Sequence, residues 1–241
     1  MLKIHSIETF GTHEGPGIRL VIFTQGCNIR CLYCHNPDLL EIKGGKEMSV
    51  YEIIEIAKNQ KEYFGDNGGI TVSGGEPTLQ SVEVLKLFKE AKKLSIHTAL
   101  DTNGTIINND VKKLYKYTDL LLLDVKHIDD EAHKKLTGCS NKNVLEMAAF
   151  RENSGKEMWL RYVLVPGIND SEKFLTSWGE HFKSYKSIKR VEILPYHTLG
   201  LYKYQELGME YKLKETPSPS ASQITLAKTI FEKYFDEVIV K

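Results

Sequence analysis

The sequence lacks several features that would define other classes of protein. It has only four cysteines in 241 residues, no apolar run of about 18 residues, and no excess of one charge, since 32 Lys and Arg balance 32 Asp and Glu. We therefore expect no membrane span, and the basic excess typical of a nucleic-acid binder is missing. The residues up to Glu8 contain no apolar signal segment, so we expect a cytoplasmic protein with reduced thiols.

Three of the four cysteines lie close together. Cys27, Cys31 and Cys34 follow a Cys-x3-Cys-x2-Cys spacing, whereas Cys139 stands alone and is expected to be a bystander. Three thiolates on a short loop suit three corners of a [4Fe–4S] cluster and leave one iron open to a non-protein ligand. The alternative is a zinc or redox binding module with a Cys3His site using His35 or another histidine, although zinc sites more often use two separated Cys-x2-Cys pairs.

Apolar, β-branched runs alternate with amphipathic stretches along the chain. About six strand–helix units predict an α/β fold with a mainly parallel sheet. The chain is slightly shorter than the roughly 250 residues of a complete barrel, so we expect a partial, open TIM-like barrel in a single domain, residues 1–241. Residues 199–220 are expected to form a long loop or lid. The expected strands cover residues 18–24, 70–72, 96–100, 120–123, 159–165, 190–194 and 237–240.

Polar motifs directly follow four of the expected strands. The carboxyl ends of parallel strands share one rim, so these motifs and the cysteine loop are expected to build a site there. The alternative, that polar residues merely end the strands, explains one motif better than it explains four. The motifs are Ser73-Gly74-Gly75-Glu76, Asp101-Thr102-Asn103, Asp124-Val125-Lys126 and Pro195-Tyr196-His197.

The cysteine loop, residues 26–37, with Tyr33 before the third cysteine, resembles the radical S-adenosylmethionine superfamily. The Gly74-Gly75-Glu76 turn resembles its glycine-rich motif. Further segments resemble the activases of glycyl-radical enzymes nearly from end to end: residues 11–19, 100–104, 123–126, 159–163 and 194–197. No cysteine occurs in the 39 residues between Cys34 and Gly74, which favours the branch without a second cluster domain. Glu14 replaces the aspartate that this family often carries.

The resemblance implies specific roles for the motif residues. Cys27, Cys31 and Cys34 would bind the [4Fe–4S] cluster, and Asp101, Thr102 and Asp124 would form a monovalent-cation site. Glu14 and Arg161 would face the substrate. The implied contacts to S-adenosylmethionine are Tyr33, Cys34, His35, Gly75, Asp124, Val125, Lys126 and His197.

Two of these positions also carry expectations from their chemistry alone. Arg161 lies inside an apolar strand, where an unpaired charge is costly, so it should point toward carboxylates or substrate. Glu76 precedes Pro77 and is suited to cap the helix that follows.

The resemblance also implies a reaction. An electron from the reduced cluster would cleave S-adenosylmethionine, and the 5′-deoxyadenosyl radical would take a hydrogen atom from a backbone glycine of pyruvate formate-lyase. A flavodoxin or ferredoxin would supply the electron, and we expect a monomer. The alternatives are activation of another glycyl-radical enzyme or radical chemistry on a small molecule.

Overall fold

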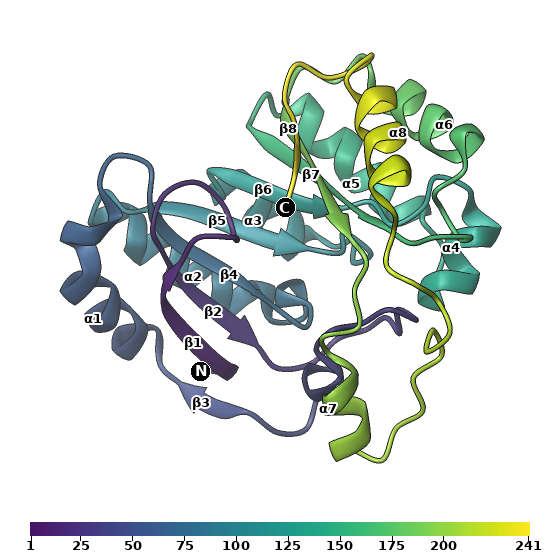
Figure 1. Cartoon of the computed structure of the whole chain (residues 1–241). Helices are drawn as coiled ribbons and strands as arrows, with labels where there is room; N and C mark the ends of the chain where they lie inside the picture. The colour runs from purple at the N-terminus through teal and green to yellow at the C-terminus, as the bar shows by residue number, and fades with distance from the viewer. The chain divides into compact units, whose positions relative to one another are not determined.

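The computed structural model describes residues 1–241 as an alternation of strands and helices along most of the chain (Figure 1). The strands are β1 (Leu2–Gly11), β2 (Arg19–Thr24), β3 (Lys46–Met48), β4 (Gly69–Gly74), β5 (His97–Thr102), β6 (Leu120–Asp124), β7 (Met158–Leu164), β8 (Ile188–Pro195) and β9 (Val238–Val240). The α-helices are α1 (Val50–Gln60), α2 (Ser81–Lys93), α3 (Asn109–Tyr117), α4 (Asp130–Thr137), α5 (Lys142–Asn153), α6 (Glu172–Phe182), α7 (Leu201–Glu206) and α8 (Ala221–Phe231). Short 3-10 helices are η1 (Pro37–Leu39), η2 (Lys61–Phe64) and η3 (Pro77–Gln80).

The nine strands form one sheet in the order β3-β1-β2-β4-β5-β6-β7-β8-β9. β4 pairs in parallel with β2 and β5, and β8 pairs in parallel with β7 and β9. The end strands β3 and β9 each have one neighbour, so the sheet is not closed. The expected α/β fold with an open, mainly parallel sheet is confirmed. None of the helices combines the length and the apolar character needed to cross a bilayer.

Two strands escaped the sequence prediction. β1 pairs antiparallel with both β2 and β3, and most of its side chains outside Leu2 and Ile4 are not buried. A strand with so little buried surface has no apolar run to reveal it. β3 has three residues, two of them exposed, so it also lacks an apolar run from which a strand could be predicted.

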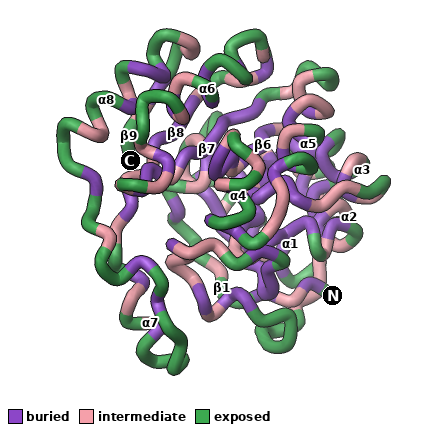
Figure 2. The backbone as a smooth tube through the Cα atoms, turned by 90° about the vertical axis from the view of Figure 1, so that its right-hand side faces the viewer, coloured by how far each residue is buried: buried purple, intermediate pink, exposed green.

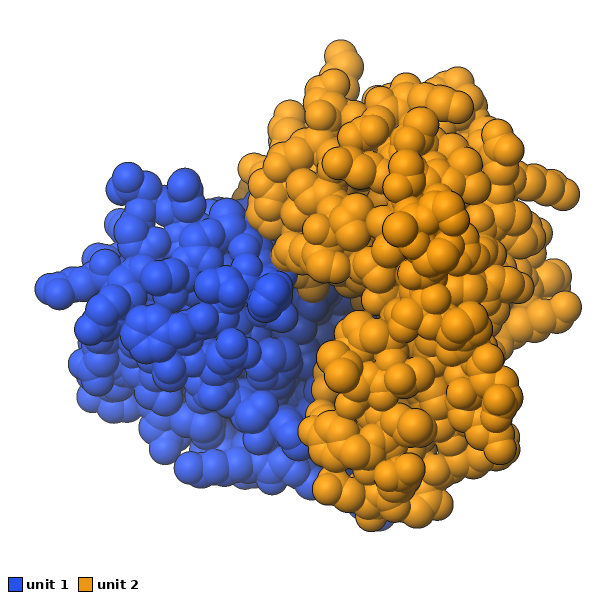
Figure 3. Space-filling model, in the orientation of Figure 1, with its two compact units in different colours: residues 1–28, 39–122 blue, residues 29–38, 123–241 orange.

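The chain forms two compact units, coloured separately in Figure 3. Unit 1 contains residues 1–28 and 39–122, and unit 2 contains residues 29–38 and 123–241. The boundary therefore divides the cysteine loop between Asn28 and Ile29.

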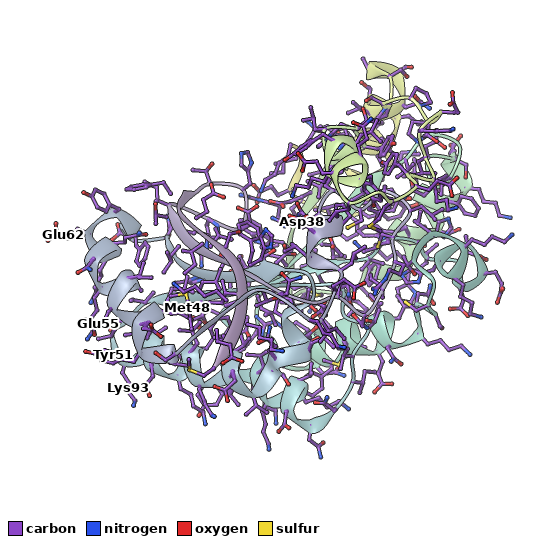
Figure 4. All side chains as sticks on the ribbon, turned by 90° about the horizontal axis from the view of Figure 1, so that it is seen from below. Asp38, Met48, Tyr51, Glu55, Glu62 and Lys93 are labelled. Carbon is purple, nitrogen blue, oxygen red and sulfur yellow. The ribbon has the colours of Figure 1, made fainter.

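Unit 1 has a core of residues on its parallel strands. Figure 2 colours the buried residues differently from the exposed ones along the backbone. Residues 20–22 on β2 have no exposed surface. On α1, Ile53 and Ala57 face this core, whereas Tyr51 and Glu55 point outward (Figure 4). Ser49 and Glu52 form the capping box that starts α1.

Unit 2 has its own aromatic core. The Trp178 ring lies 5.6 Å from Tyr162, 5.0 Å from Phe182 and 4.8 Å from Phe231 between ring centroids. Gly138 ends α4 with a φ of +83°, a left-handed conformation that suits glycine. Within the expected loop of residues 199–220, the structure has the six-residue helix α7.

Candidate functional site

The Gly74-Gly75-Glu76 turn packs on the start of the cysteine loop in unit 1. The Gly75 amide donates to Thr24 O at 3.0 Å, and the Glu76 amide donates to Gly26 O at 2.8 Å. A Cβ added to Gly75 would lie 2.1 Å from Gly26 O, and Gly74 has a φ of +111°. Both positions therefore require glycine, so that the backbone after β4 can lie directly against the chain leading to Cys27.

Glu76 is a fully buried carboxylate that links the ends of β4 and β5. It accepts hydrogen bonds from the Thr78 amide at 2.9 Å, from Thr102 Oγ1 at 2.7 Å and from the Asn103 amide at 2.8 Å. Burial raises the pKa of Glu76, whereas these hydrogen bonds oppose that shift. The predicted capping role is confirmed at η3, and the second link, to β5, was not foreseen.

Asn103 belongs to the motif Asp101-Thr102-Asn103, but the sequence analysis predicts no role for it. Its Nδ2 donates to Asn28 Oδ1 at 3.1 Å and lies 4.0 Å from Cys27 Sγ. Its Oδ1 accepts from the Thr105 amide at 3.0 Å, which fixes the orientation of the amide group. Asn103 thus brings a polar N–H group from the end of β5 to the first cysteine.

Asp101 and Thr102, the expected cation ligands of unit 1, turn toward different partners. Ser73 Oγ donates to Asp101 Oδ2 at 2.7 Å. The Thr102 hydroxyl donates to Glu76 and accepts from the Gly104 amide at 3.1 Å. Successive residues of a strand point to opposite faces of the sheet, which explains why the Asp101 and Thr102 side chains diverge.

The segment bearing Glu14 is held by Arg19 on β2. Arg19 Nη1 donates to Pro16 O at 2.9 Å, and the Thr71 hydroxyl donates to Glu14 O at 2.6 Å. Arg19 has no exposed surface, and burial lowers its pKa to about 10, opposed by the carboxylates of Asp119 and Glu14. Arg19 is thus a buried cation next to the segment predicted to face substrate.

Because of the environment of His97, we expect the folded protein to lose stability in acid. Burial and the Arg19 guanidinium lower its pKa to about 4, with Lys92 acting the same way and Asp119 opposing. Its Nδ1 faces Arg19 Nη2 at 3.2 Å and must accept, because arginine has no acceptor. Between about pH 6.5 and pH 4 the unfolded chain binds a proton that the folded chain does not, so stability decreases as pH falls.

We expect this proton to lower the free energy of unfolding by about 2 kcal/mol at pH 4.5 relative to pH 7, allowing for partial solvent screening. Urea unfolding at the two pH values measures it. His97→Asn, which keeps an acceptor near the Nδ1 position, is the matched control and should lose less stability with acid. An equal loss in both proteins would contradict the role of His97.

In unit 2, Asp124 and Lys126 form an ion pair at the end of β6. Lys126 Nζ lies 2.8 Å from Asp124 Oδ2 and 5.5 Å from the centroid of the Tyr33 ring. Burial alone would lower the pKa of Lys126, but the Asp124 carboxylate holds it well above its usual value. Lys126 is therefore a permanent cation beside Tyr33, whose own phenol pKa is raised by burial.

Val125 lies between these two charged residues and is fully buried. Its amide donates to Arg161 O at 3.2 Å, and its carbonyl accepts from Trp178 Nε1 at 3.2 Å. These bonds fix the backbone from which Asp124 and Lys126 project.

The second half of the cysteine loop is held by α4. The Arg30 amide donates to Thr137 O at 2.8 Å, and the Leu32 amide donates to Leu136 O at 2.9 Å. Burial raises the pKa of the Cys34 thiol, opposed by the Asn36 amide and the nearby Lys126 and Lys203. None of the four cysteines forms a disulfide bond.

His35 and His197 are brought together although 161 residues lie between them in the sequence. Their rings stack with centroids 4.0 Å apart and planes 26° apart, and His35 Nε2 donates to His197 O at 2.8 Å. A Cβ on Gly200 would lie 2.7 Å from His35 O, so the chain after β8 packs closely on this residue. The predicted proximity of these two motifs within unit 2 is present.

Helix α7 contacts the same loop through two residues that the sequence prediction missed. Lys203 Nζ lies 2.9 Å from Asn36 Oδ1 and 3.0 Å from Asp38 Oδ1. Tyr204 donates its hydroxyl to Cys34 O at 3.0 Å. No local pattern could reveal these contacts, because they join residues more than 160 positions apart.

The expected carboxylate partner of Arg161 is Glu192. The two residues are paired across β7 and β8, with Arg161 Nε 2.9 Å from Glu192 Oε2. Both side chains are buried, and Lys241 Nζ lies 2.8 Å from the other Glu192 oxygen. The buried charge is thus compensated within unit 2.

Comparison with known proteins identifies the family. Residues 21–176 match the model of the Radical SAM superfamily. The pyruvate formate-lyase-activating enzyme of Streptococcus mutans is 45% identical over 94% of this chain and 89% of its own length. That of Staphylococcus epidermidis is 44% identical over 91% of each chain. The chain belongs to the radical SAM superfamily, within it to the pyruvate formate-lyase-activating enzymes.

Solved structures agree with this fold. A domain of a pyruvate-formate lyase-activating enzyme from Bacteroides vulgatus matches with a TM-score of 0.61 and 23% identity, over 72% of this chain and 99% of that one. SuiB of Streptococcus suis, solved with S-adenosylmethionine, matches with a TM-score of 0.71 and 16% identity, over 92% of this chain and 50% of that one.

Membership in the radical SAM superfamily implies a [4Fe–4S] cluster and S-adenosylmethionine as cofactors, and the residues present fit them. The cysteine loop offers three thiol ligands, the ligand type that these clusters prefer. The Asn103 amide N–H group lies 4.0 Å from Cys27 Sγ, where it can donate to a thiolate.

Proposed function

We propose that this radical SAM enzyme activates pyruvate formate-lyase, and that Cys27, Cys31 and Cys34 hold the single cluster. The observation that carries the proposal is the cysteine loop itself, which provides three thiols where a fully protein-ligated cubane needs four. Cys139 follows the C-terminal end of α4, where its thiol lies 3.4 Å from Thr137 Oγ1. With three protein ligands, the fourth iron would be left for S-adenosylmethionine.

In unit 1, the backbone at Gly75 would meet the methionine amino group of S-adenosylmethionine. In unit 2, Asp124 and Lys126 would address the carboxylate and ribose, and Val125 would hold their backbone. The support for Lys126 is its permanent charge and its burial, with 7% of the residue exposed. The nucleoside side would be formed by Tyr33, Cys34, His35 and His197.

Held by these residues, the cluster and S-adenosylmethionine would supply one-electron cleavage of the sulfonium C–S bond and removal of one hydrogen atom from a glycine α-carbon of the partner. The residues of this chain orient the cofactor and exclude water. The buried Tyr33 ring beneath Lys126 provides such a surface, and the stacked, half-buried His35–His197 pair would add two flat rings beside it.

The cation and the partners complete the proposal. Asp101 and Asp124 would offer carboxylate oxygens to a monovalent cation, because hard oxygen ligands suit it, and Thr102 would join them through an oxygen other than its hydroxyl, which is engaged with Glu76 and Gly104. Glu14 would face the peptide of the partner enzyme, and Arg161 would do so from its buried pair with Glu192. A flavodoxin or ferredoxin would deliver the electron, and the enzyme would work as a monomer in the cytoplasm.

The test is an anaerobic activation assay with purified pyruvate formate-lyase, read by electron spin resonance. We expect a glycyl-radical signal on this partner that depends on S-adenosylmethionine and on a reductant, and no signal on other glycyl-radical enzymes. A signal on a different partner only would reassign the substrate. Zinc without iron or sulfide in anaerobically purified protein would contradict the cluster.

A further inference from the structure

Arg19 is a fully buried guanidinium whose hydrogen-bonding capacity is used up inside unit 1. A guanidinium has five N–H donors and no acceptor. Nη2 donates to Ile70 O at 2.8 Å and to His97 Nδ1 at 3.2 Å, and Nε donates to the Thr71 hydroxyl. Nη1 donates to Pro16 O at 2.9 Å and to Asn67 O at 3.3 Å. With five acceptors and no exposed surface, Arg19 has no donor left for an external ligand.

Two of these bonds lead to the Glu14 loop, residues 11–18. Arg19 holds Pro16 O directly. It holds Glu14 O through Thr71, whose hydroxyl accepts from Arg19 Nε and donates to the Glu14 carbonyl at 2.6 Å. The backbone on both sides of Gly15 is thus fixed to β2 and β4, while the exposed residues Thr12 and His13 remain outside this contact.

The glycines of the loop fit this arrangement closely. Gly15 has a φ of +120°, and a Cβ there would lie 3.2 Å from Arg19 Cδ and Nε. Gly17 has a φ of +68°, and its Cβ would lie 2.6 Å from the Gly68 amide nitrogen. A side chain at either position would push the loop away from the Arg19 side chain or from the chain before β4.

We propose that Arg19 and Thr71 are positioning residues that fix the Glu14 loop for the backbone of the glycine-bearing partner. This inference rests on the proposed function, in which Glu14 faces that partner. Neither residue touches the reacting atoms. Their effect is to order the loop before the partner arrives, so that binding does not have to supply the ordering.

The decisive comparison is between Thr71→Val and Thr71→Ser. Valine keeps the branched shape but removes the hydroxyl that joins Arg19 to Glu14 O, whereas serine keeps the hydroxyl. We expect Thr71→Val to raise the KM for the partner about five- to tenfold, the worth of one hydrogen bond, with kcat changed less than about twofold. Thr71→Ser should restore the wild-type KM.

Amide hydrogen exchange of residues 12–17 gives a readout that does not need activity. Exchange should be faster in Thr71→Val than in Thr71→Ser. If Thr71→Val fails to fold, Gly15→Ala tests the same loop from the other side and should raise the KM and accelerate exchange likewise. Equal KM values and equal exchange in the valine and serine variants would overturn the proposal.

A failure of the proposed function would look different. In that case wild-type protein with its cluster loaded would form no radical on the partner, or would not cleave S-adenosylmethionine in the absence of partner. The exchange comparison between the valine and serine variants would still decide whether Thr71 orders the loop.

Discussion

Replacing Cys34 with serine is expected to reduce cluster content to below about one-tenth of wild type and to abolish reductive cleavage of S-adenosylmethionine, because the cluster prefers thiolate over a hydroxyl ligand. The loop itself should keep its shape. Two bonds at this residue use its backbone, namely the Cys34 amide to Cys31 O at 3.1 Å and the Tyr204 hydroxyl to Cys34 O at 3.0 Å, and a serine hydroxyl can still accept from the Asn36 amide that faces the Cys34 thiol. The variant therefore reports on the sulfur atom.

Iron and sulfide analysis and the 5′-deoxyadenosine yield measure this effect under anaerobic conditions. Cys139→Ser is the matched control, since the Cys139 thiol contacts Thr137 and has no place in the proposed cluster site. It should retain both cluster and cleavage. A Cys34→Ser protein with full iron content would remove Cys34 from the ligand set.

Replacing Lys126 with methionine is expected to weaken S-adenosylmethionine binding about tenfold to one-hundredfold while iron content stays unchanged. Methionine keeps most of the stem next to Tyr33 but removes the charge, which leaves the Asp124 carboxylate without its 2.8 Å partner. Truncating one member of a largely buried charge pair costs about 2 kcal/mol or more.

Equilibrium dialysis with cluster-loaded protein measures the affinity. Lys135→Ala removes an exposed lysine of α4 in the same unit and should bind like wild type. An unchanged affinity in Lys126→Met would remove Lys126 from the cofactor site. A loss of iron along with affinity would instead assign Lys126 to the stability of the cysteine loop.

The strands that carry the polar motifs were predictable because each is an apolar run ended by a turn. β2, β4, β5, β6, β7, β8 and β9 all lie within a few residues of the predicted segments. β1 was not predicted, because most of its side chains are not buried and it has no apolar run. Its extended conformation depends on its pairing with β2.

The site was predictable only where a motif is local. The Glu76 cap depends on Thr78, two residues away, and could be anticipated. The contacts of Asn103 with Asn28 and of Tyr204 with Cys34 join distant parts of the chain, and no periodicity encodes them. The contact of Arg161 was partly predictable. The cost of a buried charge predicts that a carboxylate lies next to it, but not which carboxylate.

The two edges of the open sheet bear on self-association. β3 and β9 have three residues each, so each of these end strands offers about 10 Å of extended backbone. Beyond Ile4, β1 also lies at the edge, and its pairing with β2 is interrupted by irregularities between Ile4 and Ser6 and between Glu8 and Gly11. β3 also carries the exposed, charged Lys46 and Glu47. Short and charged edges are poor templates for strands of another chain. A sheet that is not closed can thus still resist the edge-to-edge pairing that closure into a barrel would abolish.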